Sequence, residues 1–263
     1  MRDVDALPVG WREAGAGPAV LFLHGLGMSR TGFDRQLAAL AERYRCIAWD
    51  MPGYGASPLP ADELTFPFLA DSVAALLDRL ELASAHLVGL SMGGQIALHA
   101  VLTHPDRVRS LSLLDSSSAF GLDGTDPDEW KRLRLGPLEQ GSEPAEFAEQ
   151  VLRGVMGPHA TDSQVAEAVA TMSRITAPAL AASMRNLVTH DVRGRLGEIA
   201  APTLVIVGEL DEETPLAYAE ALRDGIAGAE LAIVPGVGHL SNLEAPVAVN
   251  ALLASFLDRV EAA

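Results

Sequence analysis

The sequence has little cysteine, few basic residues and no long hydrophobic run, and each shortage excludes a class of protein. Its single cysteine, Cys46, permits no internal disulfide, and the apolar run around it predicts a buried thiol. With 19 Lys and Arg against 35 Asp and Glu, the net charge of −16 disfavours nucleic acid and anionic membranes as partners. No apolar run approaches the roughly 20 residues of a membrane helix. The N-terminal residues also lack the basic-then-apolar order of a signal peptide, so we expect a cytoplasmic protein.

Short apolar runs recur along the chain and predict the strands of one sheet. They are Ala19–Leu23, Cys46–Trp49, Ala85–Val88, Ser110–Leu114, Thr203–Val207 and Glu230–Val234. Segments with helical spacing separate most of them, which predicts an α/β fold with a mainly parallel sheet flanked by helices. Val9–Ala14 predicts an antiparallel edge strand at the start, and Pro246 suits the first turn of a final helix.

One region breaks this alternation. Residues 120–197 contain no convincing strand, only helical patterns separated by Gly136-Pro137, Gly157-Pro158 and Ala177-Pro178. Because strand-like runs resume at Thr203, the region predicts a helical cap inserted into a core formed by residues 1–119 and 198–263. The 263 residues suffice for one such core.

The strongest chemical signal is Gly89-Leu90-Ser91-Met92-Gly93, between a strand-like run and a helical one. This is the G-x-S-x-G pattern, in which a sharp strand-to-helix turn presents the serine above the sheet. The flanking glycines avoid a clash at a strained backbone, and the helix N-terminus favours negative charge nearby. The alternative is a tight turn in which Ser91 merely caps the helix. The strand–helix context favours a nucleophile.

A serine hydroxyl needs a base to accept its proton, and His239 is the best-placed histidine. It lies in Val237-Gly238-His239-Leu240, after a strand-like run and before the last helix, where a side chain can project from a loop. His24 ends the first central strand and is expected to brace its turn. The remaining histidines fall in strands, helices or the cap.

These motifs together resemble the α/β-hydrolase superfamily over nearly the full chain. The motifs are His24-Gly25, Asp50 to Ser57, the turn at Ser91, Gly208-Glu209-Leu210-Asp211 and Gly238-His239. The resemblance implies that the cap follows the sixth strand of the fold. Within the superfamily, Gly238 to Glu244 and the cap length are similar to the 3-oxoadipate enol-lactonase group.

The resemblance also implies the order serine, acid, histidine, which makes Asp211 the residue that orients His239. Asp115, at the end of the run Ser110–Leu114, is the alternative, because some members place the acid there. The oxyanion hole is expected to use the backbone amides of Met92 and Leu26, whose side chains would both line the pocket.

The same resemblance implies a cap tryptophan, Trp130, that binds substrate together with Arg134. Arg132 and Arg134 lie near it in the sequence and are candidates to meet a substrate carboxylate. The alternative is that Trp130 packs the cap while the arginines are solvated. The predicted activity is hydrolysis of an ester or lactone, with a small-molecule substrate, no metal and no cofactor. Cleavage of a carbon–carbon bond in a dienoate, by the same triad, is the enzymatic alternative. The second alternative is a non-enzymatic receptor for a small ligand, built on the same fold.

Overall fold

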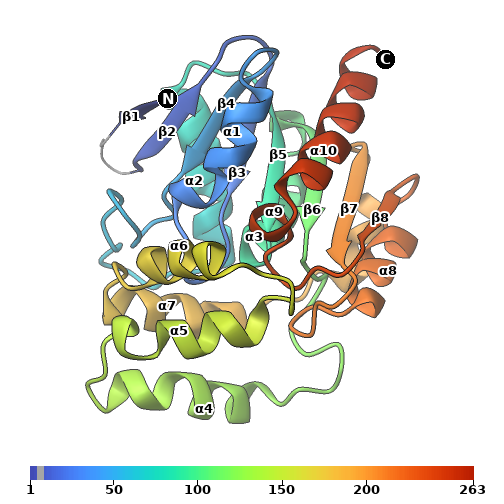
Figure 1. The fold of residues 1–263 in the computed structure, drawn as a ribbon. Helices are drawn as coiled ribbons and strands as arrows, with labels where there is room; N and C mark the ends of the chain where they lie inside the picture. The colour runs from blue at the N-terminus through green and yellow to red at the C-terminus, as the bar shows by residue number, and fades with distance from the viewer. Residues whose placement is uncertain (5–8) are drawn as a thin grey trace.

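The computed structural model describes residues 1–4 and 9–263, and within them eight strands form one sheet in the order β1-β2-β4-β3-β5-β6-β7-β8 (Figure 1). The strands are β1 (Arg2–Val4), β2 (Trp11–Ala14), β3 (Ala19–Leu23), β4 (Arg45–Trp49), β5 (Ala85–Leu90), β6 (Val108–Leu114), β7 (Thr203–Gly208) and β8 (Glu230–Val234). The β1–β2 and β2–β4 pairs are antiparallel, and every pair from β4 to β8 is parallel. The predicted mainly parallel sheet is therefore confirmed.

Helices cover both faces of the sheet, as the sequence predicts. The core helices are α1 (Asp34–Leu40), α2 (Phe66–Arg79), α3 (Met92–Thr103), α8 (Leu216–Gly225), α9 (Ser241–Glu244) and α10 (Pro246–Glu261), with short 3-10 turns η1 (Arg30–Phe33), η2 (Pro105–Arg107) and η3 (Arg193–Glu198). Helices α1 and α10 pack together on one face, while α2 and α3 pack together on the other (Figure 1). The final helix begins at Pro246, as predicted.

The N-terminal edge differs from the expectation. Val9–Ala14 was expected to be the edge strand, but β2 begins at Trp11 and β1 pairs beyond it. A run of three residues such as Arg2–Val4 is too short to carry a periodic signal, and the pairing with β2 forms it. The central strands match the buried runs closely because both of their faces are covered, and Cys46 is fully buried as expected.

Four helices lie between β6 and β7, over the carboxyl ends of the parallel strands (Figure 1). They are α4 (Pro127–Glu139), α5 (Pro144–Val155), α6 (Asp162–Met172) and α7 (Ala177–Leu187). An isolated antiparallel bridge between Ala119 and Asp191 ties the two ends of this segment together. The division of the chain into core and cap at residues 120 and 197 stays a prediction.

Gly136-Pro137 does not separate two helices as expected, because both residues lie inside α4. The proline removes a backbone donor near the end of the helix, one turn after the exposed Leu133, so solvent can satisfy the carbonyl that loses its partner. Ala177-Pro178 instead begins α7, where a proline is readily accommodated. Among the described residues, no helix combines the length and apolar character required to cross a bilayer.

Candidate active site

Ser91 lies at the sharp turn between β5 and α3, with a backbone φ of 52° and ψ of −121°. This left-handed conformation is costly for a residue with a side chain, and its neighbours hold it. The Ser91 amide donates to the carbonyl of Leu114 at 2.8 Å. A Cβ atom at Gly93 would collide with the carbonyl of Leu23, and one at Gly89 with the backbone of Gly93. The two glycines of the motif are therefore required by close backbone approach.

The structure brings Ser91, His239 and Asp211 into one hydrogen-bonded chain. His239 Nε2 is 2.9 Å from Ser91 Oγ, and His239 Nδ1 is 2.9 and 3.0 Å from the two carboxylate oxygens of Asp211. With Nδ1–H donating to Asp211, Nε2 is free to accept the serine proton. The three residues follow β5, β7 and β8 and meet at the carboxyl edge of the sheet.

His239 and Asp211 each stabilise the charged form of the other. Burial lowers the pKa of His239, but the charge of Asp211 and its hydrogen bond outweigh burial and raise that pKa above its usual range. Burial raises the pKa of Asp211, yet the charge and hydrogen bond of His239 and two bonds from Thr214 bring it below its usual value. Asp211 is therefore held as a carboxylate beside the ring.

Asp115, the alternative acid, occupies a different position. It is fully buried at the end of β6, and its carboxylate accepts the amides of Gly208 at 2.9 Å and Ser241 at 3.1 Å. Burial and the charge of Asp211 raise the pKa of Asp115 to about 7. Its bonds fasten the loops that carry Asp211 and His239, whereas the histidine ring is bonded to Asp211.

Two supporting side chains escaped the sequence analysis. Thr214 is buried, and its hydroxyl donates to Asp211 at 2.7 Å. Glu244 accepts the amides of Gly238 and Leu240, on either side of His239, and that of Gly157 in the cap. Glu244 belongs to the motif that begins at Gly238, so its spacing of five residues from the histidine was the available signal.

The two expected oxyanion donors come from the turns that follow β3 and β5. Met92 is the first residue of α3, so its amide has no acceptor within the helix. Leu26 follows β3 in a turn closed by the Met28 amide, which donates to the Gly25 carbonyl at 3.2 Å. The Leu26 side chain lines the pocket, as expected. The Met92 side chain does not, because it is fully buried in the hydrophobic core beneath the turn.

His24 makes the contacts of a brace. Its Nε2 accepts the amide of Met51 at 3.0 Å, and Nδ1 lies 2.9 Å from the Gly25 carbonyl. These bonds join the loops after β3 and β4, and the ring is buried. Burial lowers the pKa of His24, which keeps the ring neutral.

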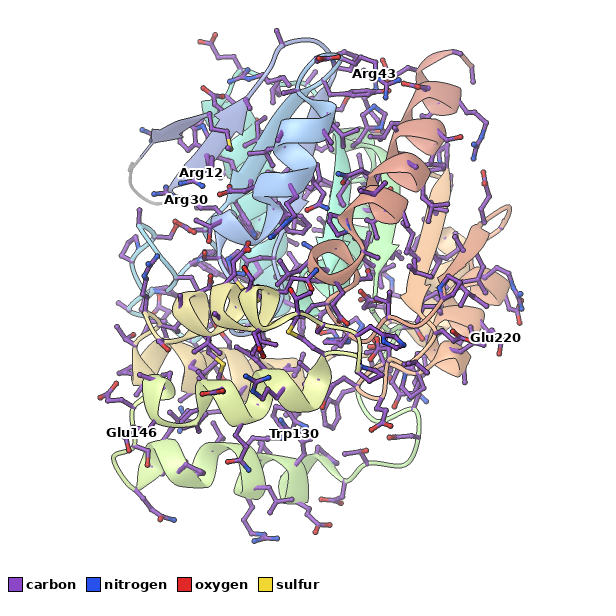
Figure 2. The ribbon with its side chains drawn as sticks, in the orientation of Figure 1. Arg12, Arg30, Arg43, Trp130, Glu146 and Glu220 are labelled. Atoms are coloured by element: carbon purple, nitrogen blue, oxygen red, sulfur yellow. The ribbon has the colours of Figure 1, made fainter. Side chains whose placement is uncertain are left out.

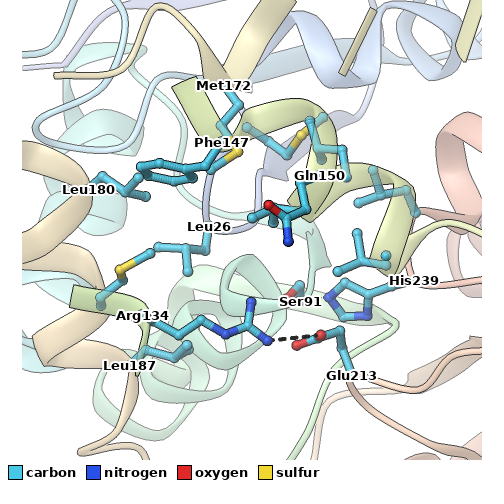
Figure 3. A pocket seen from close by; sticks show the side chains of 18 of the residues that line it. Leu26, Ser91, Arg134, Phe147, Gln150, Met172, Leu180, Leu187, Glu213 and His239 are labelled. Carbon is cyan, nitrogen blue, oxygen red and sulfur yellow. Dashed lines mark hydrogen bonds and ion pairs between the residues drawn. The ribbon is translucent and has the colours of Figure 1, made fainter. Parts of the chain in front are cut away.

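A cavity of about 470 Å³ opens between Ser91 and the cap, and we call it the apolar chamber (Figure 3). Apolar side chains dominate its wall: Leu26, Phe147, Leu152, Met172, Leu180 and Met184. A second cavity of about 250 Å³, the polar chamber, is lined by Gln95, Ser117, Asp123, Glu212, Thr214 and Tyr218. Ser91 and His239 line both.

Trp130 and Arg134 lie on α4 at the boundary shared by the two chambers (Figures 2 and 3). Trp130 packs edge-to-face on Phe120, with ring centroids 5.5 Å apart, and the Arg134 guanidinium lies 5.8 Å from the Trp130 ring centroid. Arg134 also pairs with Glu213 at 3.4 Å. Arg132 instead lies on the exposed surface of α4 and pairs with Glu129. Both Trp130 and Arg134 can therefore reach a bound substrate.

Residues 1–4 and 9–263 hold no group of three or more His, Cys, Asp or Glu side chains arranged to bind a metal ion. The hydrogen-bonded triad and the adjoining amides form the chemical centre. Together they can transfer a proton from a hydroxyl and stabilise an oxyanion.

Known proteins resemble this chain in sequence and in fold. Residues 18–153 match the family model of the alpha/beta hydrolase fold, and residues 175–262 match that of the TAP-like protein family. The chain is 34% identical to a pimeloyl-[acyl-carrier protein] methyl ester esterase of Chromobacterium violaceum, over 86% of this chain and 88% of the relative. It is 27% identical to 3-oxoadipate enol-lactonase 2 of Acinetobacter baylyi, over 92% and 89%.

A solved thermophilic esterase from Thermogutta terrifontis, with malate bound, superposes with a TM-score of 0.89 at 25% identity, over 99% of each chain. The similarity to the enol-lactonase group expected from the sequence is thus present. An esterase nevertheless has the higher identity of the two relatives named above.

Proposed function

Because the chain belongs to the α/β-hydrolase family, we propose that it is a serine hydrolase that cleaves a carboxylic ester or lactone through an acyl-enzyme. The observation that carries the proposal is the unbroken chain of hydrogen bonds from Ser91 through His239 to Asp211. The apolar chamber above Ser91 is large enough for a short acyl or alkyl group. The named relatives, which include esterases and a lactonase, add support.

In the first step, Ser91 Oγ attacks the carbonyl carbon while its proton passes to His239 Nε2. The carbonyl oxygen becomes an oxyanion that accepts hydrogen bonds from the amides of Leu26 and Met92. Collapse of the tetrahedral intermediate breaks the bond to the alcohol oxygen, which takes the proton from Nε2. The products are the acyl-enzyme and the alcohol. In a lactone the alcohol stays attached to the acyl group.

In the second step, His239 accepts a proton from water, and the hydroxide attacks the acyl carbon. The second intermediate releases Ser91, which regains its proton from His239, and the carboxylic acid leaves. Asp211 keeps Nδ1–H oriented throughout and stabilises the imidazolium that forms in each step. Trp130 and Arg134 contact the substrate where the two chambers meet.

A turnover screen of the wild type and Ser91→Ala tests the proposal, with p-nitrophenyl esters, lactones and dienoate ketones as substrates. We expect hydrolysis of esters or lactones by the wild type, and a loss of kcat of about 10⁶-fold in Ser91→Ala. Retained turnover in Ser91→Ala would contradict the role of Ser91. Turnover of the ketones alone would replace ester hydrolysis with carbon–carbon cleavage.

A further inference from the structure

Gln95 in the polar chamber has a buried hydrogen-bonding atom without a partner. Gln95 lies on α3 one turn after Ser91, is 4% exposed and lines this chamber. Its Nε2 donates to Ser117 Oγ at 3.0 Å, but among the described residues its Oε1 accepts no hydrogen bond. Because an unsatisfied buried acceptor is costly, this atom marks a place for a donor from outside the chain.

Contacts through two histidines hold Ser117, the partner of this amide, in place. The Ser117 backbone carbonyl lies 2.9 Å from His190 Nε2, and His190 Nδ1 lies 3.1 Å from His99 Nε2. Burial lowers the pKa of both histidines, so the rings stay neutral and serve as fixed hydrogen-bonding groups. With Ser117 Oγ accepting the bond from Nε2, Oε1 is the amide atom left without a partner among the described residues.

The charges at the rim of the same chamber favour donors and oppose anions. Asp123, Glu212 and Glu213 line it, and they outnumber the two basic lining residues, Arg134 and His239, whose pKa Asp211 raises. Arg134 already pairs with Glu213 at 3.4 Å (Figure 3). Bonds from Thr125 lower the pKa of Asp123, which keeps it ionised. A carboxylate entering this chamber would therefore meet excess negative charge.

We propose that the polar chamber binds a neutral or cationic hydrogen-bond donor of the substrate, a hydroxyl or an ammonium group, through Gln95 Oε1. The chamber discriminates against a carboxylate at that end. The substrate class is thus an ester or lactone with one apolar part and one donor-bearing part, joined at the carbonyl near Ser91. This inference rests on the proposed hydrolase function and assigns its substrate class.

Two matched ester sets test the proposal and separate the two ends of the substrate. The alcohol set is hydroxyethyl, propyl and carboxymethyl butanoate. The acyl set is the methyl ester of hexanoate with a terminal hydroxyl, methyl heptanoate and monomethyl adipate. In at least one set we expect kcat/KM for the hydroxyl ester to be about tenfold higher than for the ester in which a methyl group replaces the hydroxyl, propyl butanoate or methyl heptanoate. This factor corresponds to one hydrogen bond. The carboxylate ester should be slowest. The set that responds identifies the end that occupies the chamber.

Variants attribute the preference to the chamber. Gln95→Leu should reduce the hydroxyl-to-methyl ratio to near one, and Glu212→Gln, at an exposed position, should raise the rate with the carboxylate ester severalfold. Glu220→Gln removes the same charge from α8 outside both chambers and serves as the matched control (Figure 2). Glu220→Gln should change neither the hydroxyl-to-methyl ratio nor the rate with the carboxylate ester.

If the wild type is active but its hydroxyl-to-methyl ratio of kcat/KM lies within twofold of one in both sets, the proposal is overturned. So would a hydroxyl preference that survives in Gln95→Leu. If melting shows that Gln95→Leu is unfolded, Glu212→Gln decides, and an unchanged rate with the carboxylate ester overturns the proposal. Absence of turnover with every ester, p-nitrophenyl butanoate included, would instead reject the hydrolase function and this inference with it.

Discussion

At the scale of single residues, the two buried aspartates have different roles that substitution can separate. Asp211 bonds to the His239 ring, while Asp115 bonds to the backbone of two loops. We expect Asp211→Asn to lower kcat about 10⁴-fold, because the amide cannot hold the required tautomer. Asp115→Asn should lower the melting temperature and affect kcat much less. A larger loss of kcat in Asp115→Asn, measured with p-nitrophenyl butanoate, would make Asp115 the acid.

The pH dependence of kcat/KM tests the interaction between His239 and Asp211. His239 must be neutral to accept the serine proton, so kcat/KM rises with pH through the pKa of His239. The charge of Asp211 raises that pKa, and burial lowers it. Asp211→Asn removes the group that raises this pKa most, while Asp115 and Glu213 still raise it, so the acid limb of the kcat/KM profile should move to lower pH while its plateau falls. An acid limb that moves to higher pH would show that Asp211 does not raise the pKa of His239.

The sequence singled out the three residues that the structure joins by hydrogen bonds, Ser91, His239 and Asp211, because each belongs to a local pattern after a strand-like run. Neither Gln95 nor the bonds of Asp115 to two loops could be found in this way. Their importance comes from contacts between distant segments, such as Asp115 with Gly208 and Ser241. The Met92 side chain was misplaced because the pattern identifies the amide and says nothing about the direction of the side chain.

At the scale of elements, the turn from β5 to α3 depends on close backbone approach. A methyl group at Gly93 would overlap the carbonyl of Leu23 in β3, so Gly93→Ala should lower the melting temperature and abolish turnover. Gly154→Ala is the control. Gly154 lies inside α5, and a Cβ atom added there would meet nothing within 4 Å, so the substitution should stabilise the protein by up to about 1 kcal/mol. Equal melting temperatures for the two variants would contradict this account of the turn.

The elements themselves were predictable to different degrees. The buried central strands were identified within about two residues because continuous apolar runs mark strands covered on both faces. The short edge strand β1 was missed, and α4 was expected to end at Gly136-Pro137, which it contains. Strand β1 forms through its pairing with β2, and α4 tolerates Pro137 near its end, where solvent can satisfy the freed carbonyl. Local propensity is a weak guide to either outcome.

At the scale of the whole molecule, buried neutral histidines should make the fold sensitive to acid. Burial lowers the pKa of His190 to about 3, whereas in the unfolded chain it is about 6.5. Below the unfolded value the unfolded state binds the proton and the folded state does not. Stability therefore falls as pH drops from about 6.5, by about 2 kcal/mol at pH 5 for this residue.

Melting temperatures measured from pH 7 to pH 5 check this expectation. The wild type should lose about 4–8 °C through His190 over this range, at roughly 2–4 °C per kcal/mol for a protein of this size. His190→Gln removes the titrating ring, so its melting temperature should depend less on pH, even if it is lower at pH 7. Parallel pH dependence in the two proteins would show that His190 does not link folding to protons.

The central claim is that Ser91 is the nucleophile, and covalent labelling tests it most directly. A fluorophosphonate reacts with a serine whose proton a neighbouring base accepts, so the site of modification identifies the nucleophile. Intact-mass measurement and peptide mapping should locate one phosphonyl group on Ser91 of the wild type and none on Ser91→Ala. Labelling of another residue, or of Ser91→Ala at the rate of the wild type, would contradict the claim.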